Sequence, residues 1–127
     1  MTAAASPGAQ PRIFVVEDEY LIRMLLEDML ADLGYAVAAA AGSLSEARDL
    51  ADKTEIDLAI LDVNIDGEEV FPVADILAAR GKPFVFVTGY GGQGLPEHYR
   101  GRPTLQKPFQ IEDLKTTLDT MVAAARA

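Results

Sequence analysis

The sequence predicts an α/β protein built on a doubly wound sheet of five parallel strands. Three continuous apolar runs, rich in β-branched and aromatic residues, are typical of strands buried on both faces, and they span residues 13–16, 58–61 and 84–87. Amphipathic helical patterns separate these runs, so strands and helices alternate along the chain in a (βα)5 order. Right-handed crossovers that place helices on both faces favour the flavodoxin-like strand order 2-1-3-4-5.

The helices are predicted from apolar residues that recur at helical spacing. In the first helix these residues line one face until a glycine ends the pattern: Ile22, Leu25, Leu26, Met29, Leu33 and Gly34. Ser43 and Glu46 have capping-box spacing, which predicts the start of the second helix. The third helical pattern runs over 70–77 and the last over 111–125.

The remaining segments carry weaker signals. Residues 35–39 and 104–106 are the candidates for the second and fifth strands. The segment from 89 to 102 contains five glycines and leaves room only for a short helix around 95–100. We therefore expect the fourth crossover to be atypical.

Composition limits the partners and the chemistry of this chain. Its 127 residues suit one domain, predicted at 12–127 behind a loose tail at 1–11 and without an effector domain. Eleven basic against twenty acidic residues give a net charge of −9, which disfavours nucleic acid and anionic membrane surfaces as partners. The absence of cysteine and the single histidine exclude disulfides, thiolate nucleophiles and multi-histidine metal sites. Neither a signal peptide nor a membrane-spanning run is present, so a cytoplasmic location is expected.

Charged and polar residues stand where the predicted strands end. They are, strand by strand, Glu17, Asp18 and Glu19; Asp62 and Asn64; Thr88 and Gly89; and Lys107 and Pro108. In a doubly wound sheet, ligands bind outside the carboxyl ends of the strands, near the switch between the first and third strands. The functional site is therefore expected at this edge of the sheet.

The chemistry of these residues predicts an aspartyl-phosphate site. Glu17, Asp18 and Asp62 would repel one another unless a cation binds or some of them take up protons. Oxygen ligands without histidine or cysteine favour Mg²⁺, which would neutralise an incoming phosphoryl group and let Asp62 attack the phosphorus. The ammonium of Lys107 and the hydroxyl of Thr88 would supply donors for the phosphoryl oxygens.

Four motifs at these strand ends resemble the receiver domain of two-component response regulators: Val16-Glu17-Asp18-Glu19, Leu61-Asp62-Val63-Asn64, Val87-Thr88-Gly89 and Lys107-Pro108-Phe109. The resemblance runs from about residue 12 to residue 122. It implies a signalling domain, not a turnover enzyme, in which Asp62 accepts phosphate from a histidine kinase or a histidine phosphotransfer protein. It implies a Mg²⁺ site formed by Glu17, Asp18, Asp62 and the backbone carbonyl of Asn64. Thr88 and Lys107 would bind the phosphoryl oxygens and couple them to the loops.

Residues 86–91 also resemble the FAT GUY subgroup of stand-alone receivers. That subgroup is associated with bacterial general-stress signalling and with histidine kinases of the HWE type. The chain departs from ordinary receivers at Thr104, which occupies the strand position that usually carries an aromatic switch residue. Tyr90 is the expected substitute, so the predicted switch comprises Thr88, Gly89 and Tyr90.

Two further expectations concern a loop and a surface. Asp66 stands where many receivers have proline, which predicts an altered loop after the phosphorylation site. Met24 and Met29 of the first helix are expected to pack within the helix interface; as an alternative, exposed apolar residues of this helix such as Met24 and Leu30 could contact the helical dimerisation region of a kinase.

Other interpretations depend on particular residues. A phosphate-independent protein-binding pseudo-receiver would keep the fold, and Thr104 with the atypical fourth crossover leaves it open. A phosphohydrolase acting through Asp62 would lack its usual second aspartate, because Asn64 stands there. An EF-hand calcium loop beginning at Asp62 fails, because Val73 stands where the bidentate glutamate is required.

Overall fold

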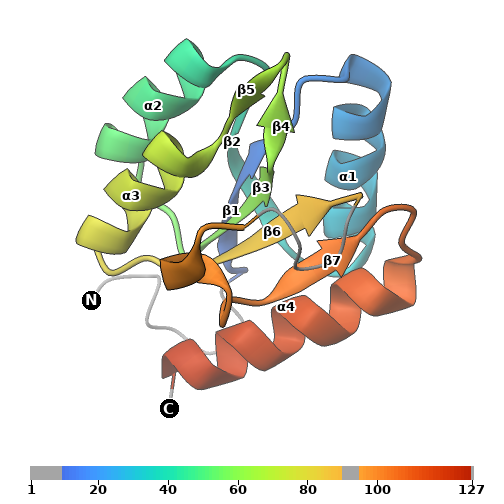
Figure 1. Cartoon of the computed structure of the whole chain (residues 1–127). Helices are drawn as coiled ribbons and strands as arrows, with labels where there is room; N and C mark the ends of the chain where they lie inside the picture. Colours follow the sequence, from blue (N-terminus) through green and yellow to red (C-terminus); the bar gives the residue numbers. More distant parts are fainter. Residues whose placement is uncertain (1–9, 90–94, 127) are drawn as a thin grey trace.

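A computed structural model describes residues 10–89 and 95–126, and it confirms the predicted fold (Figure 1). One sheet of five strands has the spatial order β2-β1-β3-β6-β7, which is the predicted order 2-1-3-4-5 when only its own strands are counted. Its strands are β1 (Arg12–Val16), β2 (Ala36–Ala41), β3 (Leu58–Asp62), β6 (Phe84–Thr88) and β7 (Thr104–Gln106). Every pairing in this sheet is parallel, so the carboxyl ends of all its strands meet at one edge.

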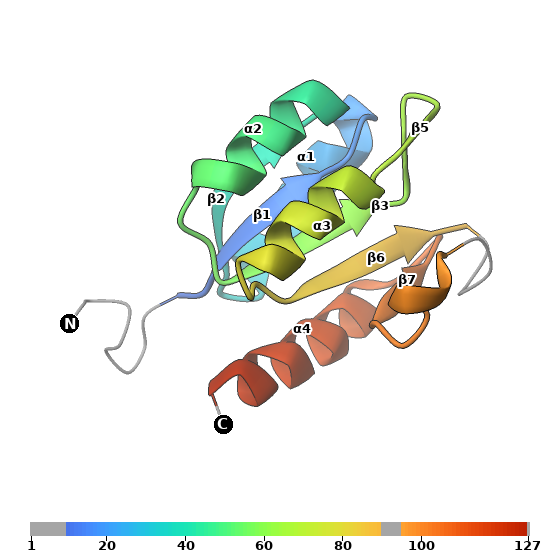
Figure 2. The same ribbon diagram turned by 60° about the vertical axis from the view of Figure 1, so that its left-hand side comes forward.

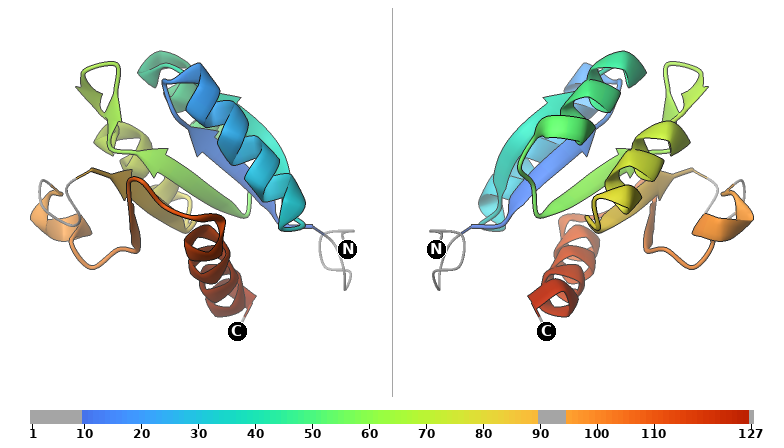
Figure 3. Two further views of the ribbon diagram at one scale, coloured as in Figure 1. Left: turned by 90° about the vertical axis from the view of Figure 1, so that its right-hand side faces the viewer. Right: turned by 90° about the vertical axis from the view of Figure 1, so that its left-hand side faces the viewer.

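Two pairs of helices cover the two faces of the sheet (Figure 3). One face packs against α1 (Tyr20–Asp32) and α4 (Ile111–Arg126), and the other against α2 (Leu44–Lys53) and α3 (Phe71–Ala79). Side chains alternate along each strand, so each apolar run supplies both cores. This double burial is the physical reason that the strands read as continuous apolar runs.

The helix signals in the sequence correspond to real helix ends. Gly34 and Gly81 follow α1 and α3 with φ values of 89° and 72°, a conformation that favours glycine. The Ser43 hydroxyl accepts a hydrogen bond from the Glu46 N–H at 3.2 Å. The Glu46 carboxylate in turn accepts the N–H of Gly42 at 3.1 Å, one residue before the position of a standard capping box.

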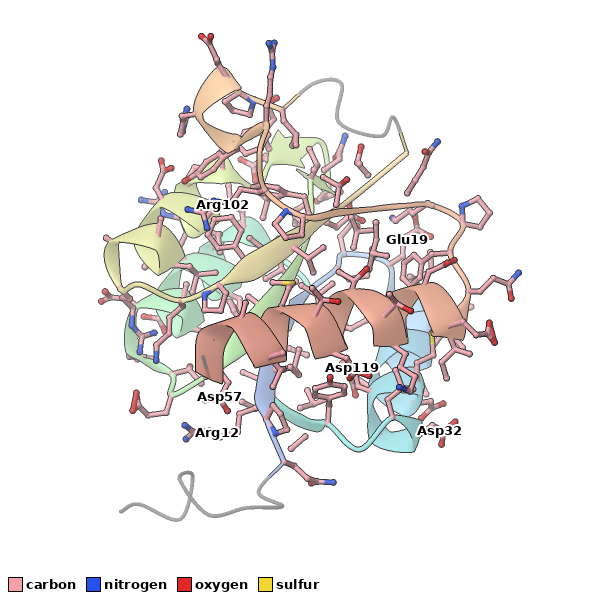
Figure 4. The ribbon with its side chains drawn as sticks, turned by 90° about the horizontal axis from the view of Figure 1, so that it is seen from below. Arg12, Glu19, Asp32, Asp57, Arg102 and Asp119 are labelled. Carbon is pink, nitrogen blue, oxygen red and sulfur yellow. The ribbon has the colours of Figure 1, made fainter. Side chains whose placement is uncertain are left out.

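Two local expectations are wrong. The second strand covers Ala36–Ala41 and not 35–39, because it pairs with β1 as far as Val16. Tyr35 lies before the strand, and its hydroxyl donates to Asp119 of α4 at 2.5 Å (Figure 4). Leu30 is fully buried and not exposed, because it lies on the face of α1 that packs on the sheet.

A short antiparallel hairpin, which the sequence patterns do not predict, follows β3. Its strands, β4 (Asn64–Ile65) and β5 (Glu68–Glu69), extend past the carboxyl end of the sheet (Figure 2). Asp66 and Gly67 form its two-residue turn, with φ values of 53° and 84°. Proline, whose φ is fixed near −65°, could not adopt this turn, so Asp66 permits the altered loop.

The crossover between β6 and β7 contains, in its described part, the 3-10 helix η2 (Glu97–Tyr99), which matches the short helix expected around 95–100. Tyr99 is 3% exposed. Its ring centroid lies 5.4 to 6.1 Å from those of three phenylalanines, Phe71, Phe84 and Phe86. Its hydroxyl donates to Asp75 of α3, and the Arg102 guanidinium lies 4.5 Å from the Phe84 ring centroid (Figure 4). Tyr99 therefore anchors this crossover to the face covered by α3.

Across the described residues, every helix falls short of the length and apolarity that crossing a membrane requires.

Candidate functional site

The structure brings the predicted polar residues together at the carboxyl edge of the sheet. The ammonium of Lys107, one residue after β7, lies between two carboxylates from other strands. Its Nζ is 2.6 Å from Asp62 Oδ2 at the end of β3 and 3.4 Å from Glu17 Oε1, one residue after β1. Although partial burial lowers the pKa of Lys107, the hydrogen bond and charge of Asp62 outweigh it and raise that pKa above its usual value. Lys107 is therefore a fixed positive charge at Asp62.

Three carboxylates form one cluster at this edge. Glu17, Asp18 and Asp62 each offer an oxygen, and these oxygens all lie within 4.8 Å of one another. Backbone N–H groups hold them: Glu19 donates to Glu17 Oε2 at 3.0 Å, Asp66 to Asp18 Oδ2 at 2.8 Å and Asn64 to Asp62 Oδ1 at 3.1 Å. The β4–β5 hairpin is thus tied to the acidic cluster through Asp66.

Burial, neighbouring charge and hydrogen bonds shift the pKa values of two carboxyl groups in the cluster. Glu17 is 1% exposed, and this burial, together with the neighbouring Asp62 carboxyl, raises the pKa of Glu17 to about 7. Asp18 is also partly desolvated, but hydrogen bonds, first from the Asp66 N–H, hold the pKa of Asp18 below its usual value. One ammonium balances only part of the charge of three carboxylates. The oxygen donors and the excess negative charge therefore fit a hard divalent cation.

The raised pKa of Glu17 predicts a pH dependence of stability in the absence of divalent cations. A carboxyl whose pKa rises on folding stabilises the folded state at low pH, and that contribution is lost as pH rises from 4.5 to about 7. Relative to Glu17→Gln, we expect the wild-type free energy of unfolding to fall by about 3 kcal/mol across this interval. Urea denaturation at pH 4.5, 6 and 7.5 with a chelator measures it. The prediction would be contradicted if the free energy of unfolding changed with pH by the same amount in the wild type and in Glu17→Gln.

Thr88 is the last residue of β6, and Gly89 follows it. Thr88 is buried, and its backbone carbonyl accepts the N–H of Lys107 at 2.9 Å, which couples the two strand ends. A Cβ atom added at Gly89 would meet no atom of the described residues within 4 Å. Asn64 begins β4, and its side-chain oxygen accepts the Gly67 N–H at 2.9 Å. Tyr90, the third predicted switch residue, lies outside the described residues.

An apolar surface adjoins the site on the α1 side. A cavity of about 200 Å³ lies between α1 and the start of the β7–α4 loop. Glu17 and Lys107 meet it at the edge, and its other lining residues are Ile22, Leu25, Leu26, Met29, Val87, Pro108 and Phe109. Next to it, α1 exposes Tyr20, Leu21, Met24 and Leu25. We call these four residues the α1 patch; it includes Met24, which is exposed rather than packed as expected, but not Leu30.

Two contacts of the site have no clear signal in the sequence. Arg23 of α1 donates from Nη1 to the backbone carbonyl of Glu17 at 2.7 Å. Tyr99 packs on Phe86, two residues before Thr88. Arg23 occupies a polar position in an amphipathic helix, and Tyr99 lies in a glycine-rich segment, so neither has a pattern that distinguishes it from a surface residue.

A family model and two solved structures match most of this chain. The family model of the response regulator receiver domain matches residues 13–119. SdrG from Sphingomonas melonis Fr1, known from its solution structure, is 39% identical, with a TM-score of 0.79 over 92% of this chain and 99% of that one. The receiver domain of Erythrobacter litoralis PhyR is 30% identical, with a TM-score of 0.78 over 91% and 92% of the two chains.

A curated relative is longer than this chain. The transcriptional regulatory protein PdtaR of Mycobacterium tuberculosis is 34% identical over 129 aligned residues. The alignment covers 98% of this chain and 63% of PdtaR, so the chain spans less than two thirds of that relative.

Proposed function

The chain belongs to the response regulator receiver domain family, and we propose that it accepts a phosphoryl group from a phosphohistidine onto Asp62. Receiver domains are signalling domains and not classical enzymes. The similarity to SdrG and PhyR supports the resemblance to the FAT GUY subgroup. The observation that carries the proposal is the position of Asp62, which is hydrogen-bonded to the Lys107 ammonium and shares the acidic cluster with Glu17 and Asp18.

In the proposed reaction, a carboxylate oxygen of Asp62 attacks the phosphorus of the phosphohistidine. The phosphorus–nitrogen bond breaks, and the imidazole leaves with the bonding electrons and takes up a proton. Lys107 and Thr88 then donate hydrogen bonds to the phosphoryl oxygens. Slow attack by water on the acyl phosphate returns the Asp62 carboxylate and inorganic phosphate, which resets the domain.

The acidic cluster is the proposed site of Mg²⁺. Its ligands would be the side chains of Glu17, Asp18 and Asp62 and the backbone carbonyl of Asn64. When bound there, Mg²⁺ neutralises negative charge on the incoming phosphoryl oxygens. The Lys107 ammonium, which lies between Glu17 and Asp62, keeps both carboxylates oriented toward the same point.

The proposed response begins at Thr88. Contact with a phosphoryl oxygen would draw the Thr88 hydroxyl toward Asp62 and shift the loop that begins with Gly89 and Tyr90 between two populations. The backbone bond from Lys107 to the Thr88 carbonyl links this movement to β7. Output would follow by protein–protein contact, and the resemblance of residues 86–91 to FAT GUY receivers supports a role in general-stress signalling.

The proposed phosphodonor is a histidine kinase, of the HWE type, or a histidine phosphotransfer protein. The α1 patch and the adjoining cavity support this proposal, because they are apolar and the cavity reaches Lys107, which contacts Asp62, the residue to which a helical donor must bring its histidine.

Replacing Leu25 of the α1 patch with glutamate tests the donor surface. Leu25 is 54% exposed and lines the cavity, so a charge there should oppose apolar docking without unfolding the chain. With a kinase that phosphorylates the wild type, we expect the transfer rate for Leu25→Glu to fall by about tenfold or more. Transfer from a small phosphodonor should be unchanged. The control is Ala79→Glu, which adds the same charge at an exposed position of α3. Equal kinase rates for the two variants would exclude the α1 patch as the donor surface.

The proposed function is tested by intact-mass spectrometry of the whole chain after incubation with a small acyl phosphodonor. We expect the mass of one phosphoryl group to be added in the presence of Mg²⁺ and lost when a chelator replaces it. If the small donor adds nothing, a candidate kinase with labelled ATP is the second donor. Failure of both donors would favour the phosphate-independent pseudo-receiver.

A further inference from the structure

Arg23 holds both ends of the acidic loop that follows β1. From the first turns of α1, its side-chain Nη1 donates to the backbone carbonyl of Glu17 at 2.7 Å. Its own backbone N–H donates to the carbonyl of Glu19 at 2.9 Å. The three residues of this loop include two members of the acidic cluster, Glu17 and Asp18. One arginine therefore closes the turn that carries them from the strand into the helix.

Gly42 provides the space in which the Arg23 guanidinium lies. Gly42 is the first residue after β2, next to the end of β1. A Cβ atom at this position would lie 2.7 Å from Arg23 Nη1, too close for an ordinary contact, so the guanidinium would have to shift. The Tyr20 ring centroid, 5.5 Å from Cζ, is a further neighbour of the guanidinium. The glycine is thus explained by the close approach of a side chain from α1.

The bond to Arg23 fixes the orientation of the Glu17–Asp18 peptide. The Glu17 N–H donates to the Ala41 carbonyl at 3.0 Å, and the Glu17 carbonyl accepts from Arg23. Both backbone polar groups of Glu17 are therefore hydrogen-bonded. The Glu17 side chain is then directed toward Lys107 and the cluster, with Oε1 3.4 Å from Nζ. Since this bond of the Arg23 guanidinium goes to a backbone carbonyl, it does not occupy a carboxylate oxygen of the cluster.

We propose that Arg23, packed against Gly42, is a positioning residue that sets the geometry of the acidic cluster for a divalent cation. The inference rests on the cation site of the proposed function and extends it to a residue outside the ligand set. Arginine suits this role because its charge cannot be lost at physiological pH and its planar fork holds a fixed direction. Without it, the loop must be ordered when the cation binds, and part of the binding free energy is spent on that ordering.

The test is a Mg²⁺ titration of the full chain, followed by the amide NMR signals of Asp18, Glu19 and Asn64 in the absence of any phosphodonor. We expect Arg23→Met to raise the Mg²⁺ dissociation constant about tenfold. Arg23→Lys keeps the charge but loses the planar guanidinium. Gly42→Ala keeps the arginine but displaces its side chain. Each variant should raise the Mg²⁺ dissociation constant about threefold. Arg48→Met is the matched control: it removes the same charge from an exposed position on α2 and should leave the constant unchanged.

Two outcomes would overturn the inference. One is a dissociation constant in Arg23→Met that is at or below the wild-type value, and the other is an equal rise in Arg23→Met and Arg48→Met, which would show that the effect is not specific to Arg23. If Arg23→Met does not fold, as judged by circular dichroism, Arg23→Lys and Gly42→Ala become the test. Wild-type Mg²⁺ dissociation constants in both variants would then overturn the inference.

A second readout separates this inference from the proposed function. With a small acyl phosphodonor, we expect Arg23→Met to need about tenfold more Mg²⁺ for half-maximal phosphorylation, while its rate at saturating Mg²⁺ stays near the wild-type rate. If Arg23→Met raises the Mg²⁺ dissociation constant as expected but the wild type accepts no phosphoryl group from any donor, the proposed function fails and the positioning role stands. If the wild type is phosphorylated and the half-saturating Mg²⁺ concentration is the same in Arg23→Met, the positioning role fails and the proposed function stands.

Discussion

Asp62→Asn is expected to accept no phosphoryl group from a small acyl phosphodonor or from a kinase. The substitution preserves the shape of the side chain but replaces the attacking carboxylate with a neutral amide, whose oxygen is a poor nucleophile. That amide oxygen could still accept the Asn64 N–H, which Asp62 Oδ1 accepts at 3.1 Å, so the loop after β3 should keep its conformation. Intact-mass spectrometry with saturating Mg²⁺ measures the loss.

The control for this prediction is Asp52→Asn, which removes a carboxylate from an exposed position on α2. It should be phosphorylated at the wild-type rate. A phosphoryl group on Asp62→Asn would show that another residue is the acceptor, and the assignment of Asp62 would then be wrong.

Lys107→Ala is expected to retain part of its phosphorylation and to lose the response of β6 and the following crossover. The Lys107 ammonium lies 2.6 Å from Asp62 Oδ2, where it would follow a phosphoryl oxygen once Asp62 is modified. Its backbone N–H, which bonds to the Thr88 carbonyl at 2.9 Å, is kept in alanine. The substitution therefore removes the charge without removing the pairing of the two strand ends.

The response is measured by the amide NMR shifts of Thr88, Gly89 and residues 95–102 before and after phosphorylation. In the wild type we expect these shifts to move together, and in Lys107→Ala we expect most of the movement to vanish although the mass increases. Lys115→Ala is the control, because it removes an exposed lysine of α4 that pairs with Asp119 at 2.7 Å. Wild-type shifts in phosphorylated Lys107→Ala would contradict the proposed coupling.

Much of the fold could be predicted because its signals are local. A strand buried on both faces must be apolar throughout, and β1, β3 and β6 are the runs that meet this condition. Parallel pairing then forces Asp62, Thr88 and Lys107 to one edge, whatever the details of packing. Their shared location follows from topology, so it could be inferred before any distance was known.

Expectations that depended on register or burial were less successful. The apolar positions of α1 predict a helix, but not that Leu30 turns toward the sheet while Leu25 stays exposed. The end of β2 was misplaced because its alanines carry no strand signal of their own, and pairing with β1 sets its length. The Asp66–Gly67 pair is a recognisable hairpin turn, but the expectation at this point extended only to an altered loop.

The sequence by itself determined the order of strands and helices, the edge of the sheet at which the polar residues gather, and the oxygen-rich character of that edge. Only the tertiary structure decided which contacts these residues make: Lys107 between Asp62 and Glu17, Tyr99 beneath β6, and Arg23 in the space left by Gly42. The physical reason is the range of the interactions. Helix and strand patterns arise within a few neighbouring residues, whereas a hydrogen bond or a close approach depends on segments that meet only when the chain folds.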